Sequence, residues 1–173
     1  SGLYYYNSVS KLFEKRSLMN GYEIYSLVFD KSGNLWIGTN MGLYNIKENK
    51  IIKFFRAVNS NQNTLAGDPV YSLAFDKYGD LWIGTNKGLC RLEKKTGTII
   101  RHNTRQEKYL SSRLIRCIYE DNKSNIWIGT TDKGLNKMEP ATGKVIQYLS
   151  DLQDSTAFWG KDATCVLQDI NGT

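Results

Sequence analysis

The stretch GNLWIGTNMGL (residues 33–43) decides the fold, because nearly the same residues return as GDLWIGTNKGL (79–89) and as SNIWIGTTDKGL (124–135). The tryptophans of the three copies are 46 and 45 residues apart, and the same register aligns an aspartate ahead of each one. A sequence that repeats at a fixed period of this length is typical of repeat architectures. The aligned positions are Trp36, Trp82 and Trp127, with Asp30, Asp76 and Asp121.

Each repeat contains four short runs of apolar residues that turn residues separate, which predicts four antiparallel strands. In the second copy these runs are VYSLAFD (70–76), DLWIGT (80–85), GLCRLE (88–93) and TIIRHN (98–103). The first turn reads FDKSGN or FDKYGD, where the Asp can accept backbone hydrogen bonds and the Gly can adopt positive φ. The third copy reads DNKSN, so Asn122 or Ser124 has to make this turn, and its geometry can differ.

The LWIGT strand is apolar on both faces, since Leu and Ile point to one side and Trp to the other. Such a strand is sandwiched between two layers, and four-stranded sheets stacked around an axis provide them. The sequence therefore predicts an all-β fold, a β-propeller segment of four-stranded antiparallel blades. A β-sandwich is the competing fold, but it does not require Trp-x-Gly at a fixed period. We also expect the Gly after the Ile to leave room for a neighbouring blade's indole, at Gly38, Gly84 and Gly129.

The chain is predicted to be one propeller segment with three complete blades and two partial ones. The blades span residues 24–56, 70–104 and 115–150, preceded by two strands of another blade in 2–20 and followed by a terminal inner strand at 163–169. Three and a half blades leave apolar sheet faces open, and such faces favour association. We expect a homodimer through these open blade edges, with eight blades in all. A single chain bent into a four-bladed ring is the alternative.

Composition excludes several classes of function. The 23 basic and 17 acidic residues give a net charge of +6 that is scattered along the chain, so a nucleic-acid partner is not expected. No apolar run approaches the roughly 20 residues of a membrane helix, and no direct membrane contact is expected. The chain lacks an initiator Met and is interpreted as an excised segment. The cysteines, Cys90, Cys117 and Cys165, are expected as buried free thiols, and with His102 as the sole histidine no metal, cofactor or catalytic set is predicted.

The pattern D-x-x-G-x-L-W-I-G-T-x-x-G-L resembles the two-component regulator propeller repeat, over three full copies and two partial ones. The resemblance implies the extracytoplasmic sensor region of a bacterial signalling protein, attached to a histidine kinase or a diguanylate cyclase. In that family the repeats build seven-bladed propellers, and this segment holds too few blades for such a ring. Streptogramin-lyase-like propellers are the nearest similar family, but their activity relies on histidines, and this chain has only His102.

Ligands of propellers usually bind at one rim, which here carries the loops between blades and the turns after the LWIGT strands. Trp159 lies outside the repeat register among polar residues, where it suits a sugar ring or fills a gap between blades. Each of the other candidates has a structural role as the alternative to ligand binding, either in a left-handed turn or on the solvated surface. The candidate ligand residues are Trp159, Arg113, Arg116, Asn40, Asn86 and Asp132.

Three hypotheses about function follow. The first is a non-catalytic sensing module that binds a carbohydrate or another small molecule on the periplasmic or cell-surface side of a membrane-anchored bacterial protein. The second is a propeller enzyme of the streptogramin-lyase-like kind, which requires further histidines outside this segment. The third is a scaffold propeller that binds another protein by its rim.

Overall fold

The computed structural model describes residues 2–102, 110–149 and 160–169. Within them the chain forms fourteen β-strands and one short 3-10 helix, η1 (Ser17–Met19), and no helix has the length and apolar character needed to cross a bilayer. The strands are β1 (Leu3–Asn7), β2 (Leu12–Arg16), β3 (Ile24–Phe29), β4 (Leu35–Thr39), β5 (Gly42–Lys47), β6 (Lys50–Phe55), β7 (Val70–Phe75), β8 (Leu81–Thr85), β9 (Gly88–Leu92), β10 (Ile99–His102), β11 (Ile115–Glu120), β12 (Ile126–Thr130), β13 (Leu135–Glu139) and β14 (Lys144–Tyr148).

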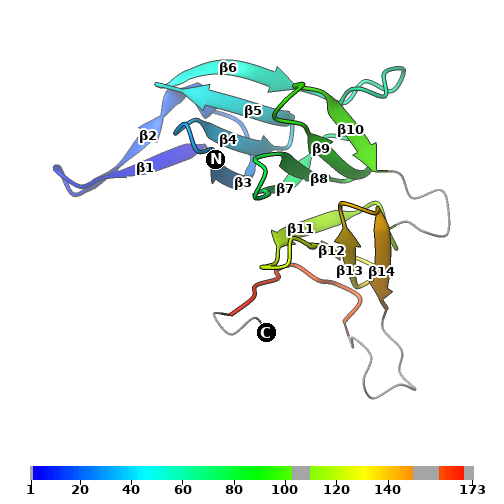
Figure 1. Ribbon diagram of the computed structural model, residues 1–173. Coiled ribbons are helices and arrows are strands. Elements are labelled where there is room, and N and C mark those ends of the chain that lie inside the picture. The colour runs from blue at the N-terminus through cyan, green and yellow to red at the C-terminus, as the bar shows by residue number, and fades with distance from the viewer. Residues whose placement is uncertain (1, 103–109, 150–159, 170–173) are drawn as a thin grey trace.

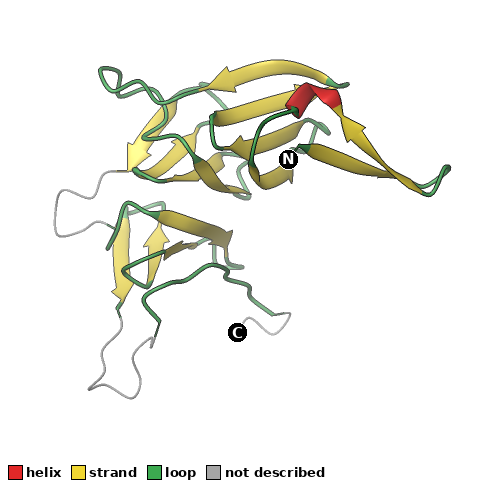
Figure 2. Ribbon diagram, turned by 180° about the vertical axis from the view of Figure 1, so that it is seen from behind, coloured by secondary structure: helices red, strands yellow, loops and turns green. Residues whose placement is uncertain are grey.

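The strands form three four-stranded antiparallel sheets and one hairpin, β1–β2 (Figure 1). In each sheet the strands pair in chain order, β3 to β6 in blade 1, β7 to β10 in blade 2 and β11 to β14 in blade 3. The β1–β2 hairpin projects away from blade 1, and both views show the three sheets fanned out as an open arc (Figures 1 and 2). The prediction of a β-propeller segment built from four-stranded antiparallel blades is confirmed.

The first strand of each sheet is the innermost one, and the blades converge there. Strand β7 contacts β3 and β4 of blade 1, and β11 contacts β7 and β8 of blade 2. Side chains from both faces of the LWIGT strands fill the spaces between the blades. One cluster joins Trp36 of blade 1 to Leu81 and Ile83 of blade 2, and the next joins Trp82 of blade 2 to Ile115 and Ile128 of blade 3. The indoles of blades 1 and 2 therefore pack toward the following blade.

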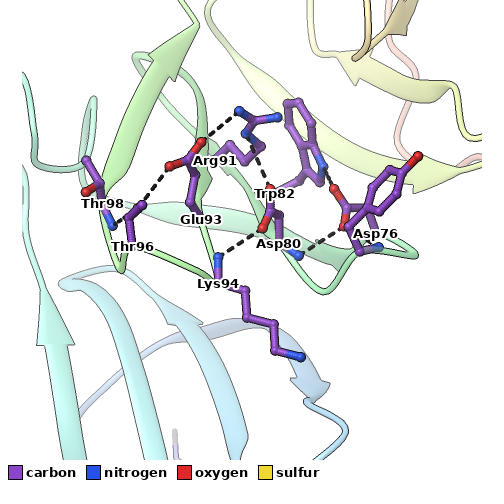
Figure 3. A network of polar contacts seen from close by, with 9 residues as sticks. Asp76, Asp80, Trp82, Arg91, Glu93, Lys94, Thr96 and Thr98 are labelled. Carbon is purple, nitrogen blue, oxygen red and sulfur yellow. Dashed lines mark hydrogen bonds and ion pairs between the residues drawn. The ribbon is translucent and has the colours of Figure 1, made fainter.

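Each repeated aspartate binds both the turn ahead of it and the indole that follows. In blade 2, Asp76 Oδ2 accepts the Trp82 indole N–H at 2.9 Å, and its Oδ1 accepts the backbone N–H groups of Tyr78 and Asp80, both at 3.0 Å (Figure 3). The same contacts recur at Asp30 and Asp121. The aspartate therefore fixes the turn and the rotamer of the indole at the same time.

The expected role of the repeated glycines is wrong in one detail. A Cβ on Gly84 would lie 2.3 Å from Ser72 Oγ of the same blade and 2.7 Å from Ile115 Cγ2 of the next. Gly38 similarly approaches Ser26 and Val70, and Gly129 approaches Cys117 and Ala163. The glycine thus leaves room for the start of the next inner strand and not for an indole. The reason is that the tryptophan and the glycine two residues later share one face of the strand, so the indole of the following blade points away from the glycine before it.

The turn without glycine keeps the geometry of the other two. Ser124 has a positive φ of 65°, close to the 77° of Gly33 and the 88° of Gly79, and its N–H donates to Asp121 O at 2.9 Å as theirs do to the aligned aspartates. A left-handed conformation costs a residue with a Cβ about 1 kcal/mol. The aspartate contacts therefore outweigh this cost in blade 3.

The end of the chain differs from its prediction. Residues 163–169 form no strand, although Ala163 N donates to Thr130 O at 2.9 Å and Cys117 Sγ contacts Ala163 O at 3.3 Å. This segment lies where an inner strand would follow blade 3, but no LWIGT strand in this sequence is available to pair with it. Cys165 is exposed, contrary to the expectation, whereas Cys90 and Cys117 are buried thiols as expected.

Both ends of the arc expose apolar sheet surface. Leu27 and Phe29 on β3 are 50% and 67% exposed, whereas the aligned Leu73 and Phe75 on β7 are covered by blade 1. A cavity of about 390 Å³ lies between the β1–β2 hairpin and this surface. At the other end Trp127 is only partly buried, and Ile146 is 43% exposed.

Pairing of two copies through these faces stays a prediction. Because an exposed apolar face favours association, light scattering at micromolar concentration is expected to give twice the mass of one chain. The monomer mass under those conditions would rule out the homodimer.

Candidate ligand-binding rim

A row of three side chains crosses the rim on which the sequence placed its candidate residues. Every inner strand has a bulge at its second residue, so the pairing register shifts between Ile24 and Ser26, and likewise in the other two blades. The bulged residues are Tyr25, Tyr71 and Arg116. A bulge re-aims a side chain, and bulges are common beside functional sites.

The three bulged side chains contact one another across blade boundaries. The Tyr25 and Tyr71 rings lie 5.1 Å apart, and the Arg116 guanidinium lies 4.8 Å from the centroid of the Tyr71 ring. Arg116 was predicted as a candidate, but the two tyrosines were missed. The alignment of the repeats would have found them, because both occupy the Arg116 position.

The row offers hydrogen-bonding and aromatic surface but no nucleophile. Tyr25 Oη donates to Glu23 Oε2 at 2.6 Å, and this hydrogen bond, with burial, raises the pKa of Tyr25 to about 12. The hydroxyl therefore stays protonated at neutral pH. The described residues contain no group of three or more His, Cys, Asp or Glu side chains that could hold a metal ion. The arrangement suits binding of a ligand by stacking and by the guanidinium charge.

The short turns after the LWIGT strands have structural contacts. Asn40 Oδ1 accepts Glu23 N at 3.3 Å, and Asn40 N donates to Glu23 O at 3.1 Å. Asn86 N donates to Pro69 O, and its Oδ1 is buried against Gly67. Both asparagines thus tie a turn to the residues that lead into the inner strand. Asp132 is exposed on the third such turn.

Two further candidates and the loops between blades complete the rim. Arg113 is exposed just ahead of β11, while Trp159 lies outside the described residues.

Loop 56–69 is held by Arg101 of β10, whose guanidinium donates to the carbonyl oxygens of Thr64 and Leu65 at 2.8 and 2.7 Å. These hydrogen bonds anchor the loop to β10.

The inner half of each blade carries the family signature. The family model described as two component regulator propeller matches residues 17–41, 64–87 and 109–132. These three segments are two-component regulator propeller repeats. Each matched range covers the inner strand and the LWIGT strand of one blade, including the aspartate and the indole it binds. The resemblance predicted from the sequence is confirmed.

Several solved structures share the fold. The extracellular domain of the putative hybrid two component system BT3049 from B. thetaiotaomicron is 20% identical, with a TM-score of 0.70 over 89% of this chain and 27% of that one. PorZ of Porphyromonas gingivalis, described as an essential surface component of the type-IX secretion system, is 13% identical, with a TM-score of 0.69 over 96% and 26%. Virginiamycin B lyase from Staphylococcus aureus is 14% identical, with a TM-score of 0.60 over 84% and 47%.

These repeats thus span about a quarter to a half of the similar chains. At such identities the likeness establishes the fold alone. No curated protein matches the sequence significantly.

His102, at the end of β10, is packed against the central indole. Its ring centroid lies 5.1 Å from that of Trp82, and its Nε2 is buried without a hydrogen-bond partner in the described part of the chain. Burial, with the nearby charge of Arg91, lowers the pKa of His102 to about 4. The imidazole is therefore neutral in the folded chain at physiological pH.

This lowered pKa predicts a pH dependence of stability. The unfolded chain binds a proton on His102 near pH 6.5, but the folded chain binds it only near pH 4. The contribution of the neutral imidazole to the free energy of unfolding is fully present above pH 6.5. It declines as the pH falls toward 4, by about 2 to 3 kcal/mol in total. Urea unfolding between pH 7.5 and 4.5 measures the decline, and His102→Phe is expected to flatten it. An equally steep decline in that variant would refute the assignment.

Proposed function

We propose that this segment is part of the extracytoplasmic sensing propeller of a bacterial two-component-type signalling protein. The observation that carries the proposal is the match of the two-component regulator propeller model to three successive repeats. A similar solved structure is the extracellular domain of a putative hybrid two component system. Ligand binding or assembly would change how propellers pack against each other, and a membrane segment would pass that change to an enzyme domain inside the cell.

The rim described above supports a binding role. The row Tyr25, Tyr71 and Arg116 brings side chains from three blades into contact, so a ligand on it would bridge all three. Long connections on a rigid scaffold commonly carry function. The ligand of this rim is proposed to be a carbohydrate or another small molecule, because stacked rings and a guanidinium can bind both apolar and hydroxylated surfaces.

A lyase is the second candidate, since virginiamycin B lyase shares the fold. The H270A form of that enzyme is described as catalytically inactive. In the present chain the sole histidine is His102, which is packed under Trp82 and kept neutral. This favours the non-catalytic role for the segment.

The complete coding sequence and the location of its product test the proposal. We expect a transmembrane helix after the last blade, followed by a histidine kinase or diguanylate cyclase domain. The propeller should also be digested by protease added to intact spheroplasts. A secreted protein that ends after its last blade would contradict the proposal and favour the lyase or a protein-binding scaffold.

A further inference from the structure

A cavity of about 640 Å³ lies between blades 1 and 2, at the rim opposite the row of bulged residues. This rim carries the turns between the first and second strands and between the third and fourth strands of each blade. The apolar part of the cavity is lined by aromatic and aliphatic side chains from both blades. They include Phe29, Trp36, Phe75, Leu81 and Leu92.

The cavity coincides with a difference between the repeats. In blade 2, Arg91 lies opposite Trp82 across the strand pair, 5.5 Å from the ring, and in blade 3 Lys137 lies opposite Trp127 at 5.3 Å. In blade 1 the residue opposite Trp36 is the shorter Asn45. The cation that covers the indole in the other two blades is thus missing, and Asn45 and Trp36 both line the cavity.

The acids that hold Arg91 are replaced as well. Arg91 pairs with Asp80 at 3.7 Å and with Glu93 at 3.2 Å (Figure 3). The aligned positions in blade 1 carry Asn34 and Lys47. Blade 1 therefore lacks the whole ionic network, and amides replace Arg91 and Asp80 there.

Both amides have unused acceptors. Asn45 is 2% exposed, and its Oδ1 has no hydrogen-bond partner within the described residues. Asn34 donates its Nδ2 to Asp30 at 2.8 Å, but its Oδ1 is also buried and unpartnered. A buried acceptor without a partner costs about 1 to 3 kcal/mol. A ligand that donates hydrogen bonds to these oxygens would recover that energy.

Four lysines around the cavity can contact an anion. Lys31, Lys53, Lys77 and Lys94 all line it, and the ion pairs of the described residues involve none of them. Figure 3 shows Lys94 reaching from blade 2 toward the strands of blade 1.

The acids of the lining are largely engaged elsewhere. Asp30 and Asp76 accept the indole and backbone N–H groups, and Glu93 is paired with Arg91. Glu120 is the fourth acid, and burial raises its pKa. Three of the four carboxylates therefore have partners, whereas Lys31, Lys53 and Lys94 form no ion pair within the described residues and the Lys77 ammonium lies 4.9 Å from the Tyr78 ring.

We propose that this cavity binds a small organic carboxylate that carries its own hydrogen-bond donors, as hydroxy acids and amino acids do. Its donors bond to the Asn45 and Asn34 oxygens, its body packs on Trp36, and its carboxylate meets the lysines. The proposal rests on the proposed sensing function, for which it specifies a ligand class and a second site.

Titration of this chain with matched compounds, followed by NMR chemical shifts, tests the proposal. Gluconate is compared with sorbitol, and L-phenylalanine with L-phenylalaninamide, so that each pair differs in the carboxylate. At least one carboxylate is expected to bind about tenfold more tightly than its matched compound. The gluconate and phenylalanine pairs distinguish hydroxy acids from amino acids.

Variants locate the site. Asn45→Lys places the residue of blade 3 opposite Trp36, so it should fold and fill the cavity, and affinity should fall about tenfold. Lys94→Ala, which changes an exposed residue, should also weaken binding, whereas Lys144→Ala on blade 3 serves as the control and should not.

The proposal is overturned if neither carboxylate binds up to about 10 mM, if the matched compounds bind equally well, or if Asn45→Lys and Lys94→Ala leave binding unchanged. Any of these results would leave the coding-sequence and location tests of the proposed function unaffected. Failure of the site is therefore distinguishable from failure of that function.

Discussion

Replacing Trp82 with alanine is expected to lower the free energy of unfolding by about 4 kcal/mol. Trp82 is completely buried, and it packs against Ile115, Ile126 and Ile128 of the next blade. Removing the indole leaves a large cavity between two blades that their rigid strands cannot close. Urea unfolding followed by circular dichroism gives the difference.

Trp127→Ala is the matched control for this prediction. The same indole in blade 3 is partly exposed and stacks on Tyr148 at 5.6 Å, with no following blade over it in this chain. Its loss should cost only about 1 to 2 kcal/mol. Equal costs for the two substitutions would mean that the indoles stabilise their own blades and not the contacts between blades.

Replacing Asp76 with alanine is expected to cost about 3 kcal/mol, because one buried carboxylate serves three donors. The substitution leaves the Trp82 indole N–H and the backbone N–H groups of Tyr78 and Asp80 without an acceptor. Asp76 is also 6% exposed, so little water can replace the lost oxygens. The same urea experiment measures the effect.

Asp30→Ala tests the reason for that cost. Asp30 makes the same contacts, but its bond from the Trp36 indole is 3.2 Å long and its side chain is more exposed. Water can reach this site, so a loss of about 1 kcal/mol is expected. If Asp30→Ala destabilised the chain as much as Asp76→Ala, burial could not be what sets the energy of this contact.

The fold was predictable because three copies of one sequence pattern have to pack in the same way. The period of the repeat, the turn aspartates and the LWIGT strand, which is apolar on both faces, can all be read from local sequence. All three indicated stacked blades. The sequence left the turn without glycine to Asn122 or Ser124 and allowed a different geometry, whereas in the structure Ser124 makes the turn with the same geometry. The glycine contacts were mispredicted because they depend on which neighbour approaches each face. Sequence spacing gives the face of a residue but not what meets it.

The candidate sites were less predictable for a related reason. Arg116 was selected for its charge, but its partners Tyr25 and Tyr71 come from other blades, and only the bulges bring the three together. The cavity beside Trp36 arises from what blade 1 lacks. Asn45, Asn34 and Lys47 are unremarkable residues until they are compared with Arg91, Asp80 and Glu93 in the next repeat. Differences between aligned repeats therefore indicated the candidate cavity, whereas the repeated residues indicated the fold and the family.

Hydrogen exchange of the indole N–H groups, followed by NMR at a concentration where light scattering shows single chains, tests the stacking of blades most directly. Trp82 lies between two blades, Trp36 is 7% exposed and Trp127 faces no further blade in this chain. The stacked arrangement predicts the slowest exchange at Trp82 and the fastest of the three at Trp127. Equal exchange at all three indoles, or slowest exchange at Trp127, would contradict it.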